Sequence, residues 1–170
     1  EAVAVFNGSS LSATGSTFDT GLSDGIDVFS NTTSAKLTLS NSTVKNFLGS
    51  GIVDLGNTKK SNLSPDIVSI DHSSIFNNDV GLDIYNGSHD LPTEVHITSN
   101  SIYDNVSFGA RTFSQIVTLT FANNWWGDKT GPYNETSNPN GLGDEVSDFI
   151  SFTPFCKNES CISHRLNLFE

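Results

Sequence analysis

The chain has 170 residues and a formal net charge of −11, with eight Lys and Arg side chains in total. This length is enough for one domain with a hydrophobic core. The lack of a basic stripe excludes nucleic acid as an expected partner, and no apolar run is long enough for membrane insertion.

The chain begins with an alternation of apolar and polar residues and shows no signal sequence. Val3 and Val5 are spaced to face a core, as in an incomplete first coil of a repeating structure. We therefore expect the chain to be a mature product or a fragment of a larger protein.

From Leu11 onward the sequence repeats itself. Each unit opens with two apolar residues separated by one polar residue, and a further apolar residue follows seven positions after the first. The units begin at Leu11, Leu37, Val68, Val95 and Val117, which gives spacings of 26, 31, 27 and 22 residues. Repeats of this length are typical of solenoids.

Each unit also has a second half, in which a glycine precedes another short alternating run. These glycines are Gly25, Gly51, Gly81 and Gly109. Each unit thus predicts two or three short strands joined by turns, and no segment has convincing helical periodicity. An antiparallel sandwich would show closely spaced hairpin turns, whereas here the similarity returns only once per unit.

The sequence therefore predicts an all-β, single-stranded right-handed parallel β-helix of about five coils. Equivalent residues of successive coils should form columns. Three columns are expected to face inward: Leu11, Leu37, Val68, Val95 and Val117; Ala13, Leu39, Ile70, Ile97 and Leu119; and Phe18, Val44, Ile75 and Ile102. One should face outward (Ser12, Thr38, Ser69, His96 and Thr118), and one should form a ladder at a turn (Asn46, Asn77 or Asn78, and Asn105).

The repeat stops at residues 123–143, a stretch that holds both tryptophans and is rich in Gly, Pro and Asn. The last coil of a solenoid needs an atypical sequence to cover its core and strand edges. Trp125 or Trp126 is suited to cover the core, and Phe149, Phe152 and Phe155 to return a last strand to the stack. The alternative role of the two tryptophans is stacking against a sugar.

This region carries a resemblance to a known group of proteins. The order Asn124-Trp125-Trp126-Gly127, Gly131-Pro132, Asn138-Pro139, Gly141 and Gly143 resembles the C-terminal end of right-handed parallel β-helix repeat proteins of prokaryotic surfaces. Their repeats are similar to those of periplasmic copper-site-maturation proteins. The resemblance implies the β-helix and an extracellular setting, but it implies no activity, because such modules serve adhesins, surface layers and lyases alike.

We divide the chain into β-helix coils at 1–122, a final coil and cap at 123–155, and a disulfide loop with a tail at 156–170. Cys156 and Cys161 are the only cysteines, and they are separated by four residues. This spacing is neither the redox motif nor a zinc site, so a local disulfide is preferred over two free thiols.

Candidate chemistry is sparse. Asp27, Asp83 and Arg111 occupy equivalent outward positions in three coils, and they are the best candidates for a polysaccharide-cleaving site. Their alternative role is as solvated surface residues. Asp128, Asn138 and Asp144 in the cap are weak candidates for calcium ligands, although turn chemistry also explains them. No cofactor is expected.

Eight Asn-x-Ser/Thr sequons indicate N-glycosylation and, together with the cysteines, a location outside the cell or at its surface. They lie at Asn7, Asn31, Asn41, Asn62, Asn86, Asn105, Asn134 and Asn158. We expect a structural or adhesive protein that assembles head-to-tail with itself or binds other surface proteins. The alternatives are a module that binds or cleaves polysaccharide, and a fragment of a larger adhesin; an enzyme is the less favoured class.

Overall fold

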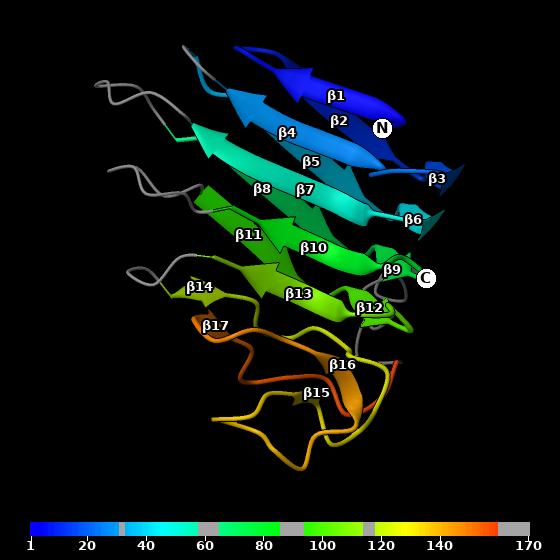
Figure 1. Cartoon of the computed structure of the whole chain (residues 1–170), viewed down its shortest axis with the longest axis vertical. Helices are drawn as coiled ribbons and strands as arrows, with labels where there is room; N and C mark the ends of the chain where they lie inside the picture. The colour runs from blue at the N-terminus through cyan, green and yellow to red at the C-terminus, as the bar shows by residue number, and fades with distance from the viewer. Residues whose placement is uncertain (31–32, 58–64, 86–93, 114–117, 160–170) are drawn as a thin grey trace, which may run out of the picture.

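The computed structural model describes residues 1–30, 33–57, 65–85, 94–113 and 118–159. Within these ranges the regular elements are all strands and none is a helix. Most of the strands belong to three long sheets, which we name A, B and C, and the chain visits the sheets in that order in every turn (Figure 1). No helix of the described chain is long and apolar enough to cross a membrane.

Each long sheet is a stack of parallel strands, one from each turn. Sheet A contains β1 (Val3–Phe6), β4 (Ile26–Ser30), β7 (Ser50–Asn57), β10 (Val80–Ile84) and β13 (Phe108–Thr112). Sheet B contains β2 (Ser10–Thr14), β5 (Lys36–Ser40), β8 (Ile67–Asp71) and β11 (Glu94–Thr98). Sheet C contains β3 (Thr17–Gly21), β6 (Thr43–Phe47), β9 (Ser74–Phe76) and β12 (Ser101–Tyr103).

This arrangement is a parallel β-solenoid of about five turns, which confirms the predicted fold class. The paired strands of all the sheets run parallel, so the antiparallel sandwich is excluded. The first turn already has one strand in each sheet, where the sequence predicted an incomplete coil.

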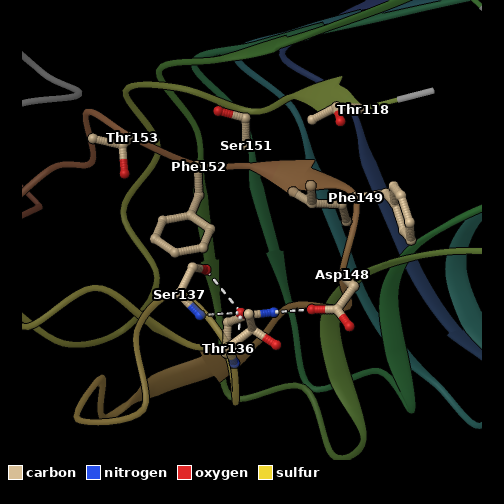
Figure 2. Close-up of a pocket in the computed structure, with 10 residues that line it drawn as sticks. Thr118, Thr136, Ser137, Asp148, Phe149, Ser151, Phe152 and Thr153 are labelled. Atoms are coloured by element: carbon tan, nitrogen blue, oxygen red, sulfur yellow. Dashed lines mark hydrogen bonds between the residues drawn. The ribbon is translucent and has the colours of Figure 1, made fainter. Parts of the chain in front are cut away.

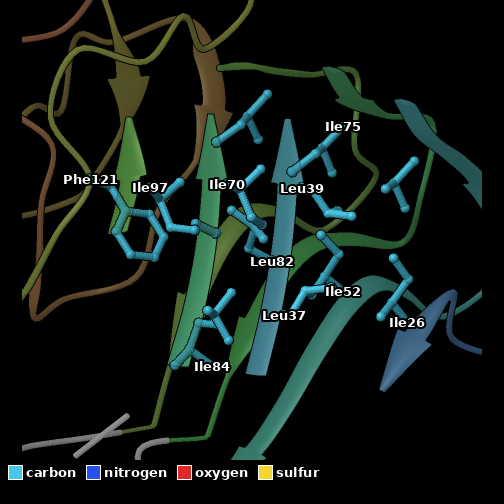
Figure 3. Packing of buried hydrophobic residues seen from close by; sticks show 14 of the residues in the cluster. Ile26, Leu37, Leu39, Ile52, Ile70, Ile75, Leu82, Ile84, Ile97 and Phe121 are labelled. Atoms are coloured by element: carbon cyan, nitrogen blue, oxygen red, sulfur yellow. The ribbon is translucent and has the colours of Figure 1, made fainter. Parts of the chain in front are cut away.

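The register of the sheets reproduces the predicted columns. Leu11 pairs with Leu37, Leu37 with Val68, and Val68 with Val95, while Val117 lies outside the described residues. The second column as far as Ile97 and the whole third column follow the same register in sheets B and C, whereas Leu119 pairs with Ile150 in a separate small sheet. Their branched side chains pack in layers between the three sheets (Figure 3). The core is therefore a narrow stack that extends along the whole solenoid.

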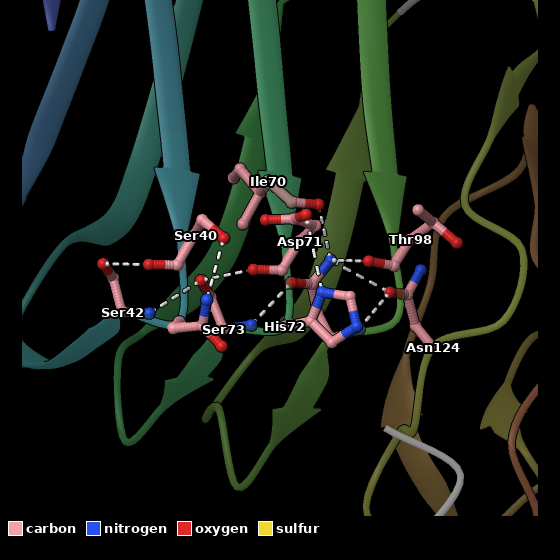
Figure 4. A network of polar contacts seen from close by, with 10 residues as sticks. Ser40, Ser42, Ile70, Asp71, His72, Ser73, Thr98 and Asn124 are labelled. Carbon is pink, nitrogen blue, oxygen red and sulfur yellow. Dashed lines mark hydrogen bonds and ion pairs between the residues drawn. The ribbon is translucent and has the colours of Figure 1, made fainter. Parts of the chain in front are cut away.

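Two ladders of polar side chains close the corners between the sheets. At the corner from sheet B to sheet C, each ladder side chain accepts a hydrogen bond from the backbone N–H of the equivalent residue one turn earlier, beginning with the N–H of Ser16 (Figure 4). The residues of this ladder are Ser42, Ser73, Asn100 and Asn124. The residue before each of them has positive φ, which turns the chain sharply.

The second ladder, at the corner from sheet C to sheet A, contains Asn78, Asn105 and Asp144. The predicted ladder was therefore right for Asn78 and Asn105 but wrong for Asn46. Asn46 instead accepts a 3.4 Å hydrogen bond from Asn77 outside this buried row. Gly81 lies against the ladder, and a Cβ atom there would come 2.5 Å from the carbonyl oxygen of Gly109, so this corner requires glycine.

The C-terminal segment continues the stack and then closes it. Trp125 bridges to Ser101 of sheet C, and Val146 bridges to Ala110 of sheet A. Two small sheets complete this end: β14 (Leu119–Thr120) with β17 (Ile150–Ser151), and β15 (Pro132–Tyr133) with β16 (Gly143–Glu145). We call residues 123–155 the cap.

The last strand returns to the stack as predicted, and Phe152 and Phe155 pack against the core, but Ile150 takes the inward place that was predicted for Phe149. Ile150 pairs with Leu119, and Ile150 and Phe152 are buried. Phe149 is exposed instead, because it occupies a turn with a φ of 62° that precedes β17. The predicted inward role of Phe149 was therefore wrong.

Candidate functional site: the outer face of sheet A

Three of the predicted site residues lie in one column on the outer face of sheet A. The register pairs Asp27 with Val53, Val53 with Asp83, and Asp83 with Arg111. Their neighbours along each strand, such as Ile26 and Leu82, point into the core, so this column points outward. Val53 separates the two aspartates.

Asp83 and Arg111 form a two-point ion pair. Arg111 Nε donates to Asp83 Oδ1 at 3.3 Å, and Nη2 contacts Oδ2. The guanidinium also lies over the rings of Phe113 and Phe108, at 4.9 and 5.7 Å. The hydrogen bond that Arg111 donates to Asp83 raises the pKa of Arg111, so this side chain is a fixed cation and is unsuited to act as a base.

Asp27 has a different environment, at the N-terminal end of the column. Its Oδ1 atom is buried and has no hydrogen-bond partner among the described residues. Burial, a hydrogen bond with the Glu1 carboxyl and the nearby charge of Asp24 raise the pKa of Asp27 to about 6. The two aspartates are two strands apart, roughly 9.6 Å at the usual strand spacing. This separation is at the upper end of the range for the two carboxylates of an inverting glycoside hydrolase. Asp83, however, is already bound by Arg111 and is not free to act on a substrate.

We expect Asp27→Asn to stabilise the chain at about pH 7.5 and to have little effect at about pH 4. A raised carboxyl pKa means that the folded state holds more protons than the unfolded state between pH 3.8 and about 6. Stability from this group is thus complete at low pH and falls as pH rises through that window. The measurement is urea unfolding of both proteins across the pH range, with Glu145→Gln as the control for loss of an exposed carboxylate. A constant difference between wild type and Asp27→Asn at all pH values would contradict this assignment.

The outer face of sheet A also carries a feature that the sequence analysis missed. A second outward column runs beside the aspartates and is apolar throughout, and we call it the aromatic stripe. It consists of Phe6, Phe29, Leu55, Tyr85 and Phe113. The exposed fractions are 48% for Phe6, 43% for Leu55, 36% for Tyr85 and 51% for Phe113. Four large apolar side chains that are exposed to solvent are thus aligned on one face.

Within the stripe the rings stack in pairs. The ring centroids of Phe6 and Phe29 are 5.8 Å apart, and those of Tyr85 and Phe113 are 4.5 Å apart. A sequence signal for this stripe exists, because every unit has an aromatic residue or Leu two positions after its outward residue of the aspartate column. The sequence predictions considered carboxylates and tryptophans as candidate site residues and did not include these side chains.

The two tryptophans take separate places in the cap. Trp126 is fully buried at the end of the core, and its indole Nε1 has no hydrogen-bond partner in the described part of the chain. Trp125 is partly exposed. Trp126 therefore presents no face for stacking against a sugar, and its position fits the predicted covering of the core.

The weak calcium candidates do not come together. Asp128 accepts hydrogen bonds from Thr130 in a local turn, whereas Asn138 donates to the carbonyl oxygens of Thr130 and Pro132. Asp144 ends the second ladder, where it accepts two hydrogen bonds from Asn105. Among the residues that the structure describes, no three His, Cys, Asp or Glu side chains form a possible metal site.

The sequons differ in accessibility. Asn7, Asn41 and Asn158 are exposed, and Asn31, Asn62 and Asn86 lie outside the described residues. Asn105 and Asn134 are buried, and the side-chain amide of each donates hydrogen bonds within the fold. Attachment of a glycan to either amide is incompatible with this structure, because both nitrogens are enclosed by protein.

Cys156 is buried next to the cap, and Cys161 lies outside the described residues, so the pairing of the two stays a prediction.

Comparison of the chain with protein-family models, with curated proteins and with solved structures finds no match. The assignment of a function therefore depends on the surface of the solenoid itself.

Proposed function

We propose that this chain is an extracellular structural or adhesive β-solenoid that associates with a second copy of itself through the aromatic stripe. The observation that carries the proposal is the alignment of exposed apolar side chains on sheet A. Apolar surface gathered in one place is typical of an interaction site, whereas single exposed apolar residues are ordinary. The sequons and the resemblance to right-handed β-helix surface proteins support the extracellular location.

Charge favours a second copy as the partner. The column beside the stripe carries carboxylates at Asp27 and Asp83 and a cation at Arg111. In an antiparallel face-to-face pair with its two-fold axis between β7 and β10, Arg111 of each copy lies opposite Asp27 of the other. An isologous contact of this kind is self-complementary.

Cleavage or binding of polysaccharide on this face is less well supported. Arg111 engages both oxygens of Asp83, so this carboxylate is not available as an acid, base or nucleophile. The paired rings of the stripe lie nearly parallel, with interplanar angles of 16° and 27°, so one face of each ring is directed at its partner and not at solvent. Stacking against a sugar requires a free ring face.

We expect the wild-type chain to form dimers as its concentration rises and Tyr85→Ser/Phe113→Ser to remain monomeric. The two substitutions remove the most strongly stacked pair of the stripe, and their surface position should leave the fold intact. Multi-angle light scattering measures the mass, and circular dichroism checks folding. The matched control is Leu22→Ser, which removes an apolar side chain that is 90% exposed outside the stripe.

A wild-type chain that stays monomeric up to about 1 mM would contradict the proposal, since a contact of only ~4 kcal/mol is half-populated there. Dimers that persist in the double variant would place the contact elsewhere.

The predicted head-to-tail contact is a second candidate, and one observation favours it. Among the described strands β1, β2 and β3 each pair on one side only, and Leu11, Ala13 and Phe18 beneath them are partly exposed. Unpaired strand edges over apolar side chains readily accept another strand. Such a contact is heterologous and grows into filaments, whereas pairing through the stripe stops at two copies. The same light-scattering series, which reports mass beyond the dimer, separates the two.

A further inference from the structure

A pocket of about 330 Å³ lies in the cap, between the loop after β15 and the final strand β17 (Figure 2). Its volume is at the lower end of the range for small-molecule sites, which is ~300–1,000 Å³. Its walls carry five hydroxyl side chains, one carboxylate and two aromatic rings. These are Thr118, Thr136, Ser137, Ser151, Thr153, Asp148, Phe149 and Phe152.

Asn134 holds one wall of the pocket in a fixed shape. Its buried Oδ1 accepts hydrogen bonds from the backbone N–H groups of Thr136 and Ser137 and from the Ser137 hydroxyl, at 3.2, 2.8 and 2.7 Å. Its Nδ2 donates to the carbonyl oxygen of Val146 at 2.9 Å and to Asp148 Oδ1 at 3.4 Å. One buried amide therefore joins the loop to the segment that precedes β17, and the polar groups are positioned before any ligand arrives.

The lining groups select the chemistry of a ligand. Hydroxyl groups both donate and accept hydrogen bonds, and a carboxylate accepts two, so the pocket suits a molecule with several hydroxyl groups. Asp148 is the one charged side chain of the lining, and no ion pair is formed with it by the described Lys, Arg and His side chains. An anionic ligand would meet an unbalanced carboxylate. Phe149, which also lines the pocket and is 43% exposed, adds an apolar surface next to these polar groups.

We propose that the cap pocket binds one pyranose ring of a neutral sugar. The carboxylate of Asp148 accepts hydrogen bonds from two ring hydroxyls, Ser137 and Thr136 contact the neighbouring hydroxyls, and the exposed ring of Phe149 packs against the C–H groups. This site is separate from the aromatic stripe, so sugar binding can be tested independently of self-association. A solenoid with both features joins copies of itself through sheet A and holds a glycan residue at its end.

The test is a titration of the full chain with glucose, galactose and mannose, followed by ¹H–¹⁵N NMR, with glucuronate as the anionic probe. We expect saturable shifts for at least one neutral hexose at Ser137, Ser151 and Phe152, with a Kd of about 1–10 mM. Asp148→Asn should weaken binding at least about tenfold, because one charge-assisted hydrogen bond is worth that factor. Glu145→Gln, which removes an exposed carboxylate of the cap outside the pocket, should bind like the wild type.

Three results would overturn the proposal. The first is the absence of shifts at the lining residues with all three hexoses at about 100 mM, far above the expected Kd. The second is equal affinity of Asp148→Asn and Glu145→Gln for the hexose that binds. The third is tighter binding of glucuronate than of its neutral counterpart glucose. Thr136→Val serves as a second variant, since it tests the hydroxyl wall without touching Asp148, and it should weaken binding as well.

Discussion

Replacing Asn100 by alanine is expected to lower the free energy of unfolding by about 3 kcal/mol, since several buried polar groups lose their partners at once. Asn100 Oδ1 accepts from the Ser73 N–H at 3.0 Å, and Nδ2 donates to the carbonyl oxygen of Ile70 at 2.9 Å. The side chain is fully buried, so water cannot replace these bonds. The measurement is the midpoint and slope of urea unfolding, read by circular dichroism.

Asn140→Ala is the matched control for Asn100→Ala, because it removes the same side chain from an exposed position of the cap. Its effect should stay within about 0.5 kcal/mol. A loss of less than about 1 kcal/mol for Asn100→Ala would mean that the ladder contributes no more than an ordinary surface hydrogen bond.

Replacing Trp126 by alanine is expected to cost about 3–5 kcal/mol, the usual range for removal of a buried large aromatic side chain. Trp126 is the largest fully buried side chain of the described chain and closes the end of the core. Its loss should expose the last turn, so limited proteolysis is expected to cut the cap before the coils. Urea unfolding and the order of the proteolytic fragments are the two measurements.

Two further variants separate the packing of Trp126 from other effects. Trp126→Phe keeps much of the buried volume and removes an indole N–H that has no partner among the described residues, so it should cost clearly less than Trp126→Ala. Trp125→Ala, at the partly exposed neighbour, should also cost less. Equal losses for Trp125→Ala and Trp126→Ala would contradict the assignment of Trp126 as the closing residue.

The fold was readable from the sequence because the solenoid repeats one set of physical requirements in every turn. Inward columns need branched apolar residues, so Leu37, Val68 and Val95 appear at matching places and set the register. The corners were harder to predict, because one residue must adopt positive φ and the next must supply the polar side chain of the ladder. Asn41, His72 and Ser99 all adopt positive φ, and none of them is glycine, so only the small polar residue that follows marks the turn.

The surface was less predictable, because a column of side chains does not show its contacts in the sequence. Asp83 and Arg111 were placed in one column, but their mutual ion pair, which removes both as free catalytic groups, depends on side-chain reach across one strand spacing. The pocket depends on Asn134, whose sequon suggested a surface glycan and whose buried amide instead organises a wall. Whether Asn134 carries a glycan or organises the pocket depends on its burial, and this burial arises only when the cap is folded.

The stacking of turns also determines how this molecule responds to force. Each turn is bonded to the one before and the one after by parallel strands in three sheets. Tension that pulls one terminal strand away from the stack is resisted only by the hydrogen bonds of that turn, so the turns separate one after another. A load applied to the side face, parallel to the strands, is shared by the hydrogen bonds of all turns, which resist it in shear. A protein of this shape is therefore mechanically weak along its axis and strong across it, which favours loading from the side face.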